Sequence, residues 1–226
     1  MLMGHGGLNL PYDVPANEYL TFSGKQFSKS RGIGVWIPDV IEKFDVDTIR
    51  YYLSINMPER HDTDWNWEDF IAKNNNELVG TYGNFIHRVL TFTQKNFGEI
   101  PETGALEKND MRILDEIEKT ADDTAEAIKL CHFKDGIKRI IKLAQTGNQY
   151  MNDNAPWKLL EEDKKRCATV LHICLRIVKA LAVFSVPYMP KSANKIWHML
   201  GYKGTIDDRE WEEGLRELEK SGLEKP

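Results

Sequence analysis

The sequence predicts a mainly α-helical protein in which an antiparallel helical bundle follows a small α/β linking subdomain. From residue 65 onward, apolar residues recur three and four positions apart, which is typical of helices with one buried face. Short loops rich in turn residues separate these stretches, and such loops favour antiparallel packing. A strand-like alternation occurs earlier, from Tyr19 to Phe22. We therefore expect the α/β part over residues 1–64 and the bundle over residues 65–226.

Composition and charge limit the classes of function. The chain has 226 residues, enough for one large or two modest domains, and its net charge is −5. Any contact with nucleic acid must therefore come from local basic faces rather than from the overall charge. The three cysteines form no CxxC pair, which indicates reduced thiols and a cytoplasmic protein. We expect no signal peptide and no membrane span, since the apolar run at residues 180–186 is too short.

A basic loop follows the predicted strand. Gly24 and Gly32 bracket two hydroxyls and three cations within nine residues, and glycine permits the backbone conformations that turns require. Such a loop can present ammonium groups, hydroxyls and backbone N–H groups to a polyanion. The plain alternative is a solvated hairpin tip.

Two short helices are expected after this loop. The first runs from Pro38 to Phe44, with proline in its first turn. The second covers residues 45–57, begins at a capping Asp45 or Asp47, and ends before Pro58. Its apolar face consists of Ile49, Tyr52 and Leu53.

Residues 59–64 predict a polar turn, and the large rings of Trp65 and Trp67 predict core anchors. A long helix from Glu68 to Asn96 follows, because no proline interrupts its helical spacing and Gly98 closes it. Asn109 or Asp110 is expected to cap the next helix. The later helices are expected over residues 109–130, 134–152, 163–186 and 192–200, with a frayed one over 211–220.

Three residues of the helical part are candidates for recognition. Asn84 and Arg88 lie four positions apart, so they share one helix face, and both side chains can read base edges. Trp157 follows a proline-made helix break, where an exposed ring can stack on an unpaired base. The plain alternatives are an ordinary polar face and a buried core tryptophan.

Two basic clusters are candidates for phosphate contact or, alternatively, for solvated faces. One lies in the helix expected over residues 134–152 and the other follows Trp157. They consist of Lys134, Lys138, Arg139 and Lys142, and of Lys158, Lys164, Lys165 and Arg166. The histidines and cysteines show no metal-ligand spacing.

The basic loop resembles the KMSKS signature of class I aminoacyl-tRNA synthetases. The matching residues are Phe27-Ser28-Lys29-Ser30, followed by Arg31-Gly32. The resemblance implies a mobile loop that closes over ATP phosphates. Lys29, which lies between Ser28 and Ser30, would stabilise the charge on the phosphates in the transition state. Phe27 replaces the methionine of the signature and Gln26 replaces its first lysine, so either Lys25 substitutes or the loop relies on Lys29.

A second resemblance concerns the bundle. Asn84-x-x-x-Arg88 and Ala155-Pro156-Trp157 resemble elements of the anticodon-binding domain of methionyl-tRNA synthetases. The resemblance implies that Asn84, Arg88 and Trp157 contact the tRNA anticodon and face one another across the bundle. Residues 47–52 resemble the linking helix of the same enzymes, and the Phe-Ser-Lys-Ser form points to the archaeal or eukaryotic type.

Taken together, the resemblance implies the carboxyl-terminal part of a monomeric enzyme that uses ATP with Mg²⁺ to activate methionine and transfers it to tRNA. The His-Ile-Gly-His motif of these enzymes is absent from the sequence, so we expect this chain to be inactive alone. Zinc in the family belongs to an insertion that this sequence lacks. Two alternatives remain: a stand-alone tRNA-binding or helical interaction module, and a synthetase for another aliphatic amino acid. Ser30-Arg31-Gly32 and Ala155-Pro156-Trp157 argue against the latter.

Overall fold

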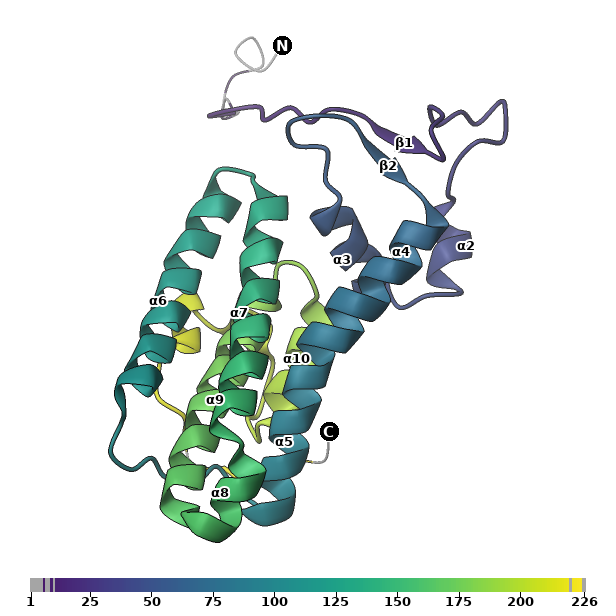
Figure 1. Cartoon of the computed structure of the whole chain (residues 1–226). Helices are drawn as coiled ribbons and strands as arrows, with labels where there is room; N and C mark the ends of the chain where they lie inside the picture. Colours follow the sequence, from purple (N-terminus) through teal and green to yellow (C-terminus); the bar gives the residue numbers. More distant parts are fainter. Residues whose placement is uncertain (1–5, 7–8, 10, 220, 225–226) are drawn as a thin grey trace.

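The computed structural model describes residues 6, 9, 11–219 and 221–224. It is mostly helical, with a small two-stranded sheet near one end of the long helices (Figure 1). This arrangement agrees with the expected mainly α-helical class preceded by a small α/β part.

The sheet joins two segments that lie far apart in the chain. Strand β1 (Leu20–Phe22) pairs in parallel with β2 (Thr63–Trp65), with Leu20 opposite Thr63 and Phe22 opposite Trp65. The prediction of a polar turn over residues 59–64 was therefore wrong at its end. Only three residues form β2, and its pairing partner lies about 40 residues upstream, so the local sequence carries little strand signal.

Helices α2 (Ile37–Ile41) and α3 (Val46–Ile55) lie between the two strands in sequence. Pro38 stands in the first turn of α2, as predicted, although the helix ends three residues earlier than Phe44. Asp45 caps α3 by accepting a hydrogen bond from the Asp47 N–H at 2.9 Å. Leu53 does not belong to the buried face, because 37% of its surface is exposed.

Helix α3 also forms hydrogen bonds with a segment near the end of the chain, residues 187–192. The buried Asp47 accepts a hydrogen bond from the Ser192 N–H at 2.6 Å, in the first turn of α10 (Pro190–Met199). Arg50 donates from Nε to the Tyr188 carbonyl at 2.9 Å and from Nη2 to the Pro187 carbonyl at 2.6 Å. The linking helix is thus fixed to the corner that precedes α10.

Trp65 and Trp67 are core anchors, as predicted. Trp65 is 3% exposed and stacks on Phe70 at 5.6 Å between ring centroids, with the Tyr52 ring edge-on at 5.0 Å. Trp67 meets Phe70 edge-on at 5.6 Å. These rings join the small sheet to the start of the long helix.

The predicted long helix is present from Trp67 to Asn96, but its middle has π-helical geometry. It consists of α4 (Trp67–Lys73), the π-helical segment η1 (Asn74–Gly83) and α5 (Asn84–Asn96). The Asn84 N–H, at the end of this segment, donates to the Val79 carbonyl, five residues earlier. Apolar spacing does not distinguish a π-helical turn from an α-helical one, so this segment was not predicted.

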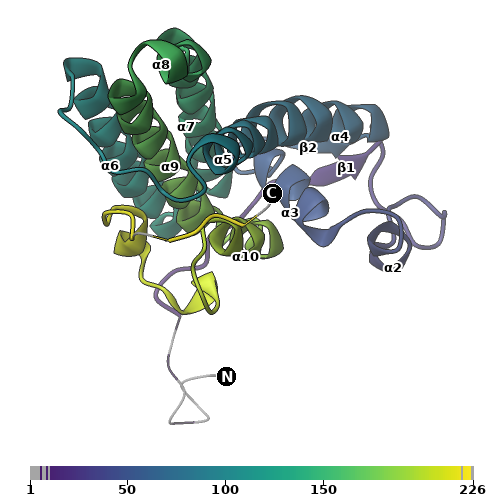
Figure 2. The same cartoon turned by 90° about the horizontal axis from the view of Figure 1, so that it is seen from below.

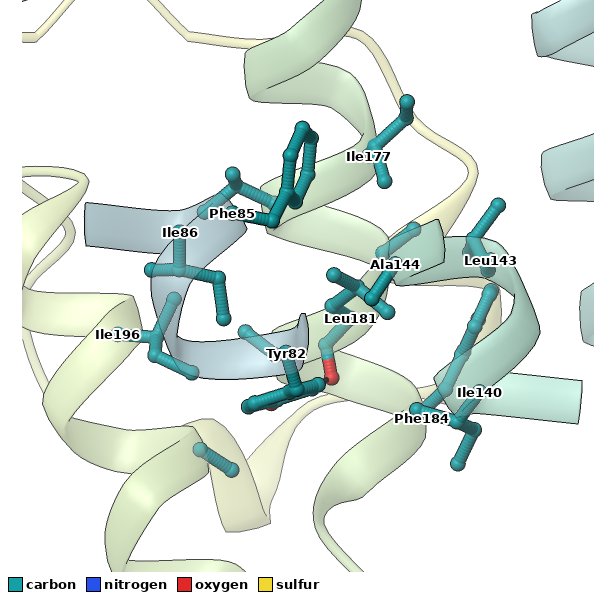
Figure 3. Packing of buried hydrophobic residues seen from close by; sticks show 14 of the residues in the cluster. Tyr82, Phe85, Ile86, Ile140, Leu143, Ala144, Ile177, Leu181, Phe184 and Ile196 are labelled. Atoms are coloured by element: carbon teal, nitrogen blue, oxygen red, sulfur yellow. Dashed lines mark hydrogen bonds between the residues drawn. The ribbon is translucent and has the colours of Figure 1, made fainter. Parts of the chain in front are cut away.

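The helical part packs around one buried helix. Helix α9 (Lys164–Ser185) contacts α5, α6 (Lys108–Lys129), α7 (Phe133–Asn154), α8 (Pro156–Glu162) and α10 (Figures 1 and 2). It is long and apolar enough to cross a membrane, yet 94% of its most apolar stretch is buried inside the protein. Phe85, Ile177 and Leu181 belong to the core that surrounds it (Figure 3). Helix α9 is therefore the core of the bundle.

Three local predictions were wrong. Glu107, rather than Asn109 or Asp110, caps α6, while the Asp110 carboxylate accepts from the Glu107 N–H at 2.9 Å. Helix α8 was not expected, because seven residues give too few apolar positions for a periodic signal. In the tail, only the short 3₁₀ turns η2 (Ile206–Asp208) and η3 (Trp211–Gly214) form within the described residues, where a helix over 211–220 was expected. Trp211 stacks on Phe184 at 4.8 Å, so packing on α9 decides the tail conformation.

Candidate functional sites

The basic loop begins with a tight turn that Asp64 holds in place. Ser23 and Gly24 both have positive φ, 48° and 72°, which is the geometry of a type I′ hairpin turn. The Asp64 Oδ1 accepts hydrogen bonds from the Gly24 N–H at 2.8 Å and from the Thr21 hydroxyl at 2.6 Å. The prediction that Gly24 serves a turn is confirmed, and β2 supplies the residue that fixes this turn.

The signature residues occupy a second hairpin, with a four-residue loop. Ser28 and Ile33 exchange backbone hydrogen bonds at 2.8 and 3.0 Å, and the Gly32 N–H donates to the Lys29 carbonyl at 3.2 Å. Gly32 has a φ of 65°, which favours glycine at this position. Lys29 and Ser30 are therefore exposed at the tip, with the Ser28 and Ser30 hydroxyl oxygens 3.3 Å apart.

Phe27 and Lys25 occupy the base of this loop. The Phe27 ring lies 6.1 Å from the Phe22 ring, between centroids, and 43% of its surface is exposed. Phe27 therefore packs the loop against β1, a contact that leaves much of its ring open. Lys25 is exposed beside the first turn, and Gln26 lies between the two.

The second candidate site brings together residues from three helices. Arg88 of α5 donates from Nη2 to the Asn152 side chain of α7 at 2.9 Å, and from Nη1 to Asn148 at 3.4 Å. Its guanidinium carbon lies 5.9 Å from the ring centre of Trp157, the second residue of α8. Trp157 is 43% exposed, so the alternative of a core tryptophan is wrong. Asn84 is exposed one helical turn before Arg88.

Local backbone geometry places Trp157. Ala155 ends α7 in a left-handed conformation with a φ of 43°, and Pro156 begins α8 at once. Asn148 and Asn152, which orient Arg88, were not predicted as site residues. Their spacing of four along α7 was the available signal, but nothing in the sequence showed that α7 faces α5.

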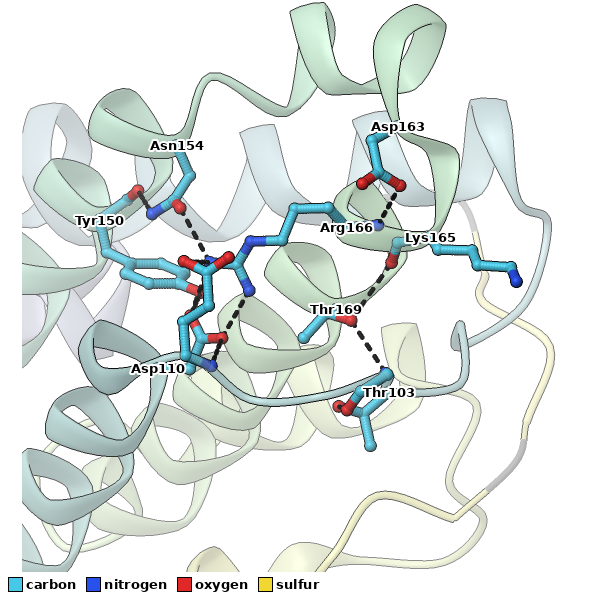
Figure 4. Close-up of polar contacts among 10 residues, drawn as sticks. Thr103, Asp110, Tyr150, Asn154, Asp163, Lys165, Arg166 and Thr169 are labelled. Atoms are coloured by element: carbon cyan, nitrogen blue, oxygen red, sulfur yellow. Dashed lines mark hydrogen bonds and ion pairs between the residues drawn. The ribbon is translucent and has the colours of Figure 1, made fainter.

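One member of the basic cluster after Trp157, Arg166, is bound inside the protein. Arg166 is bound by Asp110 through two hydrogen bonds of 2.5 and 2.9 Å, and Tyr150 donates to the same carboxylate at 2.5 Å (Figure 4). Burial alone would raise the pKa of Asp110, but the hydrogen bonds from Arg166 and Tyr150 outweigh burial and lower it. Arg166 is therefore neither a solvated side chain nor a free cation, because its guanidinium is bound to Asp110.

Two family models together match most of the chain. The description "tRNA synthetases class I (M)" matches residues 1–90, and "Anticodon binding domain of methionyl tRNA ligase" matches residues 100–222. The chain belongs to the methionyl-tRNA ligase anticodon-binding family. The helices α6, α7, α8 and α9 all lie within the second match, while α5 and the basic loop lie before it.

Curated relatives carry the same name. The methionine–tRNA ligase of Pyrococcus abyssi is 45% identical over 212 residues, which cover 93% of this chain and 28% of that protein. The methionine–tRNA ligase of Methanopyrus kandleri is 42% identical over 227 residues, or 100% of this chain and 33% of that protein. The chain thus spans about a third or less of these relatives.

A solved structure agrees with the family assignment. The Mycobacterium tuberculosis methionyl-tRNA synthetase in complex with methionyl-adenylate superposes with a TM-score of 0.82 at 27% identity. The match covers 97% of this chain and 44% of that protein. Both the α/β part and the helical part of the methionyl-tRNA ligase family are therefore represented in this chain.

Proposed function

We propose that this chain is the part of a methionine–tRNA ligase that binds the anticodon of methionine tRNA. The observation that carries the proposal is the Arg88–Trp157 pair, an exposed ring beside an oriented guanidinium. An exposed indole offers a stacking surface to an unpaired base, and a guanidinium can form paired hydrogen bonds with a base edge. Asn84 supplies a further amide on the same helix.

The basic loop has a separate role in this proposal. ATP binds as its magnesium complex in this proposal. The exposed Lys29 at the hairpin tip places a cation beside the ATP phosphates, where negative charge develops during methionine activation. Ser28 and Ser30 supply hydroxyls on either side, and Lys25 takes the place of the missing first lysine. Phe27 holds the base of the loop against β1 and helps to form the nucleotide site.

We further propose a boundary near residue 65 between the end of the catalytic part and the anticodon-binding part, whose helices form the antiparallel bundle of that domain. The three-residue connection between α6 and α7, which pack against each other, supports this topology. The free cysteines, Cys131, Cys167 and Cys174, support a cytoplasmic location. We also propose that the protein is a monomer and that its partners are tRNA, methionine and ATP.

The test is direct binding of this chain to tRNAs that differ only in the anticodon. We expect tRNA with the anticodon CAU to bind more tightly than tRNAs with single anticodon changes, each change costing about 1–3 kcal/mol. Equal affinity for all of them would contradict anticodon recognition and favour a general helical interaction module.

A further inference from the structure

A second candidate site lies farther along α7 from the Arg88–Trp157 site and differs from it in charge. It is a cavity of about 430 Å³ between α3, α7 and the junction of α4 with η1. We call it the lysine cavity. Its lining consists of Ile55, Lys73, Glu77, Lys134, Lys138, Ile141, Lys142 and Gln145.

The cations of the lysine cavity outnumber the anions. Lys73 is paired with Asp69 at 2.9 Å, and the Glu77 carboxylate accepts a hydrogen bond from Tyr51 at 2.5 Å. Within the part of the chain that the structure describes, no ion pair forms at the other three lysines of the lining. These are Lys134, Lys138 and Lys142.

Like charges gathered in a concave site repel one another. Burial lowers the pKa of Lys134 most, the positive charges of Lys138 and Lys73 lower it further, and the smaller opposing effects of Glu59 and Asp135 do not restore it. An anion seated among these ammonium groups would relieve both effects. Lys134 is half-buried while Lys138 and Lys142 are exposed, so the three ammonium groups border one cavity that stays open to a large ligand.

The lysine cavity and the Arg88 site share one face of α7. Lys134, Lys138, Gln145, Asn148 and Asn152 follow one another at steps of four, seven, three and four residues, which keeps them on one side of a helix. The first three line the cavity, and the last two hold Arg88. The fourteen residues from Lys138 to Asn152 rise about 21 Å along the helix axis.

The facing helix runs in the same order. Lys73 and Glu77 line the cavity, the Thr81 carbonyl accepts from Asn148 at 3.0 Å, and Arg88 reaches Asn152. The lysine cavity and the Arg88–Trp157 site therefore lie along the same side of α7, where it packs against the long helix. One extended ligand that reached both sites would meet cations at one end and base-reading groups at the other.

We propose that the lysine cavity binds the phosphodiester backbone of the same RNA whose anticodon reaches Arg88 and Trp157. This inference rests on the proposed function and adds a second contact to it. Lysine acts on phosphate as a flexible point charge, so this contact positions the RNA and carries no sequence information. The Arg88 site then reads bases on an RNA that the cavity has already aligned.

The test compares the double variant Lys138→Gln/Lys142→Gln with the unchanged chain. Binding of tRNA with the anticodon CAU, and of one altered anticodon, is measured at several salt concentrations. We expect the double variant to lower both affinities by the same factor, roughly tenfold or more at 0.1 M salt, and to reduce the salt slope by about 2. The matched control is Lys43→Gln/Lys203→Gln, which removes two exposed lysines that do not line the cavity. The variant Lys138→Arg/Lys142→Arg keeps the charges and should bind as the unchanged chain does.

Three outcomes would overturn the inference. In the first, the double variant has the same tRNA affinity and the same salt slope as the control variant. If the unchanged chain still discriminates anticodons in that case, the proposed function stands and only the inference about the cavity fails. In the second, ATP binds the unchanged chain and no longer binds the double variant. That result would assign the cavity to a free nucleotide. The third is an unchanged chain that binds no tRNA at all, which would contradict the proposed function as well.

Discussion

The guanidinium carbon of Arg88 lies 5.9 Å from the ring centre of Trp157, although 69 positions separate the two residues. The contact depends on the left-handed Ala155, which ends α7 and turns the chain back toward α5. Hydrogen bonds from Arg88 to Asn148 and Asn152 hold the guanidinium in position. The pair is therefore arranged before any ligand arrives, which lowers the entropy cost of binding.

Trp157→Ala should weaken binding of methionine tRNA by roughly ten- to hundredfold, since a stacked base is worth about 1–3 kcal/mol. Trp36 is the matched control, because it is also 43% exposed but lies in the α/β part. Trp36→Ala should leave tRNA affinity unchanged. Equilibrium binding measures both variants, and thermal melts check that each is folded. Equal losses in the two variants would show that the Trp157 ring does not stack on a base.

Arg88→Ala should reduce discrimination between CAU and altered anticodons by about 1–3 kcal/mol, because a base-edge contact carries sequence information. Asn152→Ala removes the 2.9 Å hydrogen bond that positions Arg88 and should cause a smaller loss of the same kind. The ratio of affinities for the two tRNAs measures this effect independently of overall binding. A folded Arg88→Ala protein with unchanged discrimination would exclude Arg88 as a reader.

Asp110 should make the fold sensitive to acid. Its pKa is lowered in the folded protein, so its contribution is present above the unfolded value of about 3.9 and is lost as pH falls through the lower folded value. Asp110→Asn should cost about 3 kcal/mol near neutral pH, because Arg166 loses its buried partner, and should flatten the fall of stability below about pH 4. Denaturant melts between pH 2 and 7 measure both effects. Asp153→Asn, at an exposed position on α7, is the control, and an equally steep acid profile in Asp110→Asn would contradict the assignment.

Gly147→Ala should destabilise the fold by about 1–3 kcal/mol through overpacking. A Cβ at Gly147 would lie 2.5 Å from Cζ of Phe85, a ring that is fully buried and cannot move aside. Gly222→Ala is the control, since a Cβ there meets nothing within 4 Å. Thermal melts of the two variants test the close approach of α7 to α5. A variant at Gly147 as stable as the control would show that the two helices can separate without cost.

The 226-residue chain should show no methionine-dependent exchange of pyrophosphate into ATP, because the His-Ile-Gly-His motif is absent from its sequence. A full-length methionine–tRNA ligase serves as the positive control in the same assay. In a longer protein that has the activity, Lys29→Ala should lower the activation rate far more than it weakens methionine binding. Pyrophosphate exchange by the chain above a no-protein background would contradict the first expectation. Equal losses of activation rate and methionine binding in Lys29→Ala would contradict the second.

Periodic apolar spacing predicted α6 and α7 well, because each buries one stripe over 22 residues, and the long apolar run predicted α9, which is buried on nearly all sides. Sequence reasoning failed where distant contacts decide the structure. Strand β2 exists only through pairing with β1, and the tail follows the surface of α9 instead of forming its own helix. For the candidate site, the motif residues were found, but Asn148 and Asn152 were not, because only the packing of α7 on α5 gives them a role.

The junction between α3 and the corner before α10 has a consequence for evolutionary change. Asp47 and Arg50 bind only main-chain atoms of Pro187, Tyr188 and Ser192. Substitutions of the Pro187 and Ser192 side chains therefore need not weaken these three hydrogen bonds, provided that the backbone path is kept, whereas the buried Tyr188 is also constrained by the core. Asp47 and Arg50 have no such freedom, and neither does the length of the corner, because an insertion or deletion there would move every acceptor and donor at once.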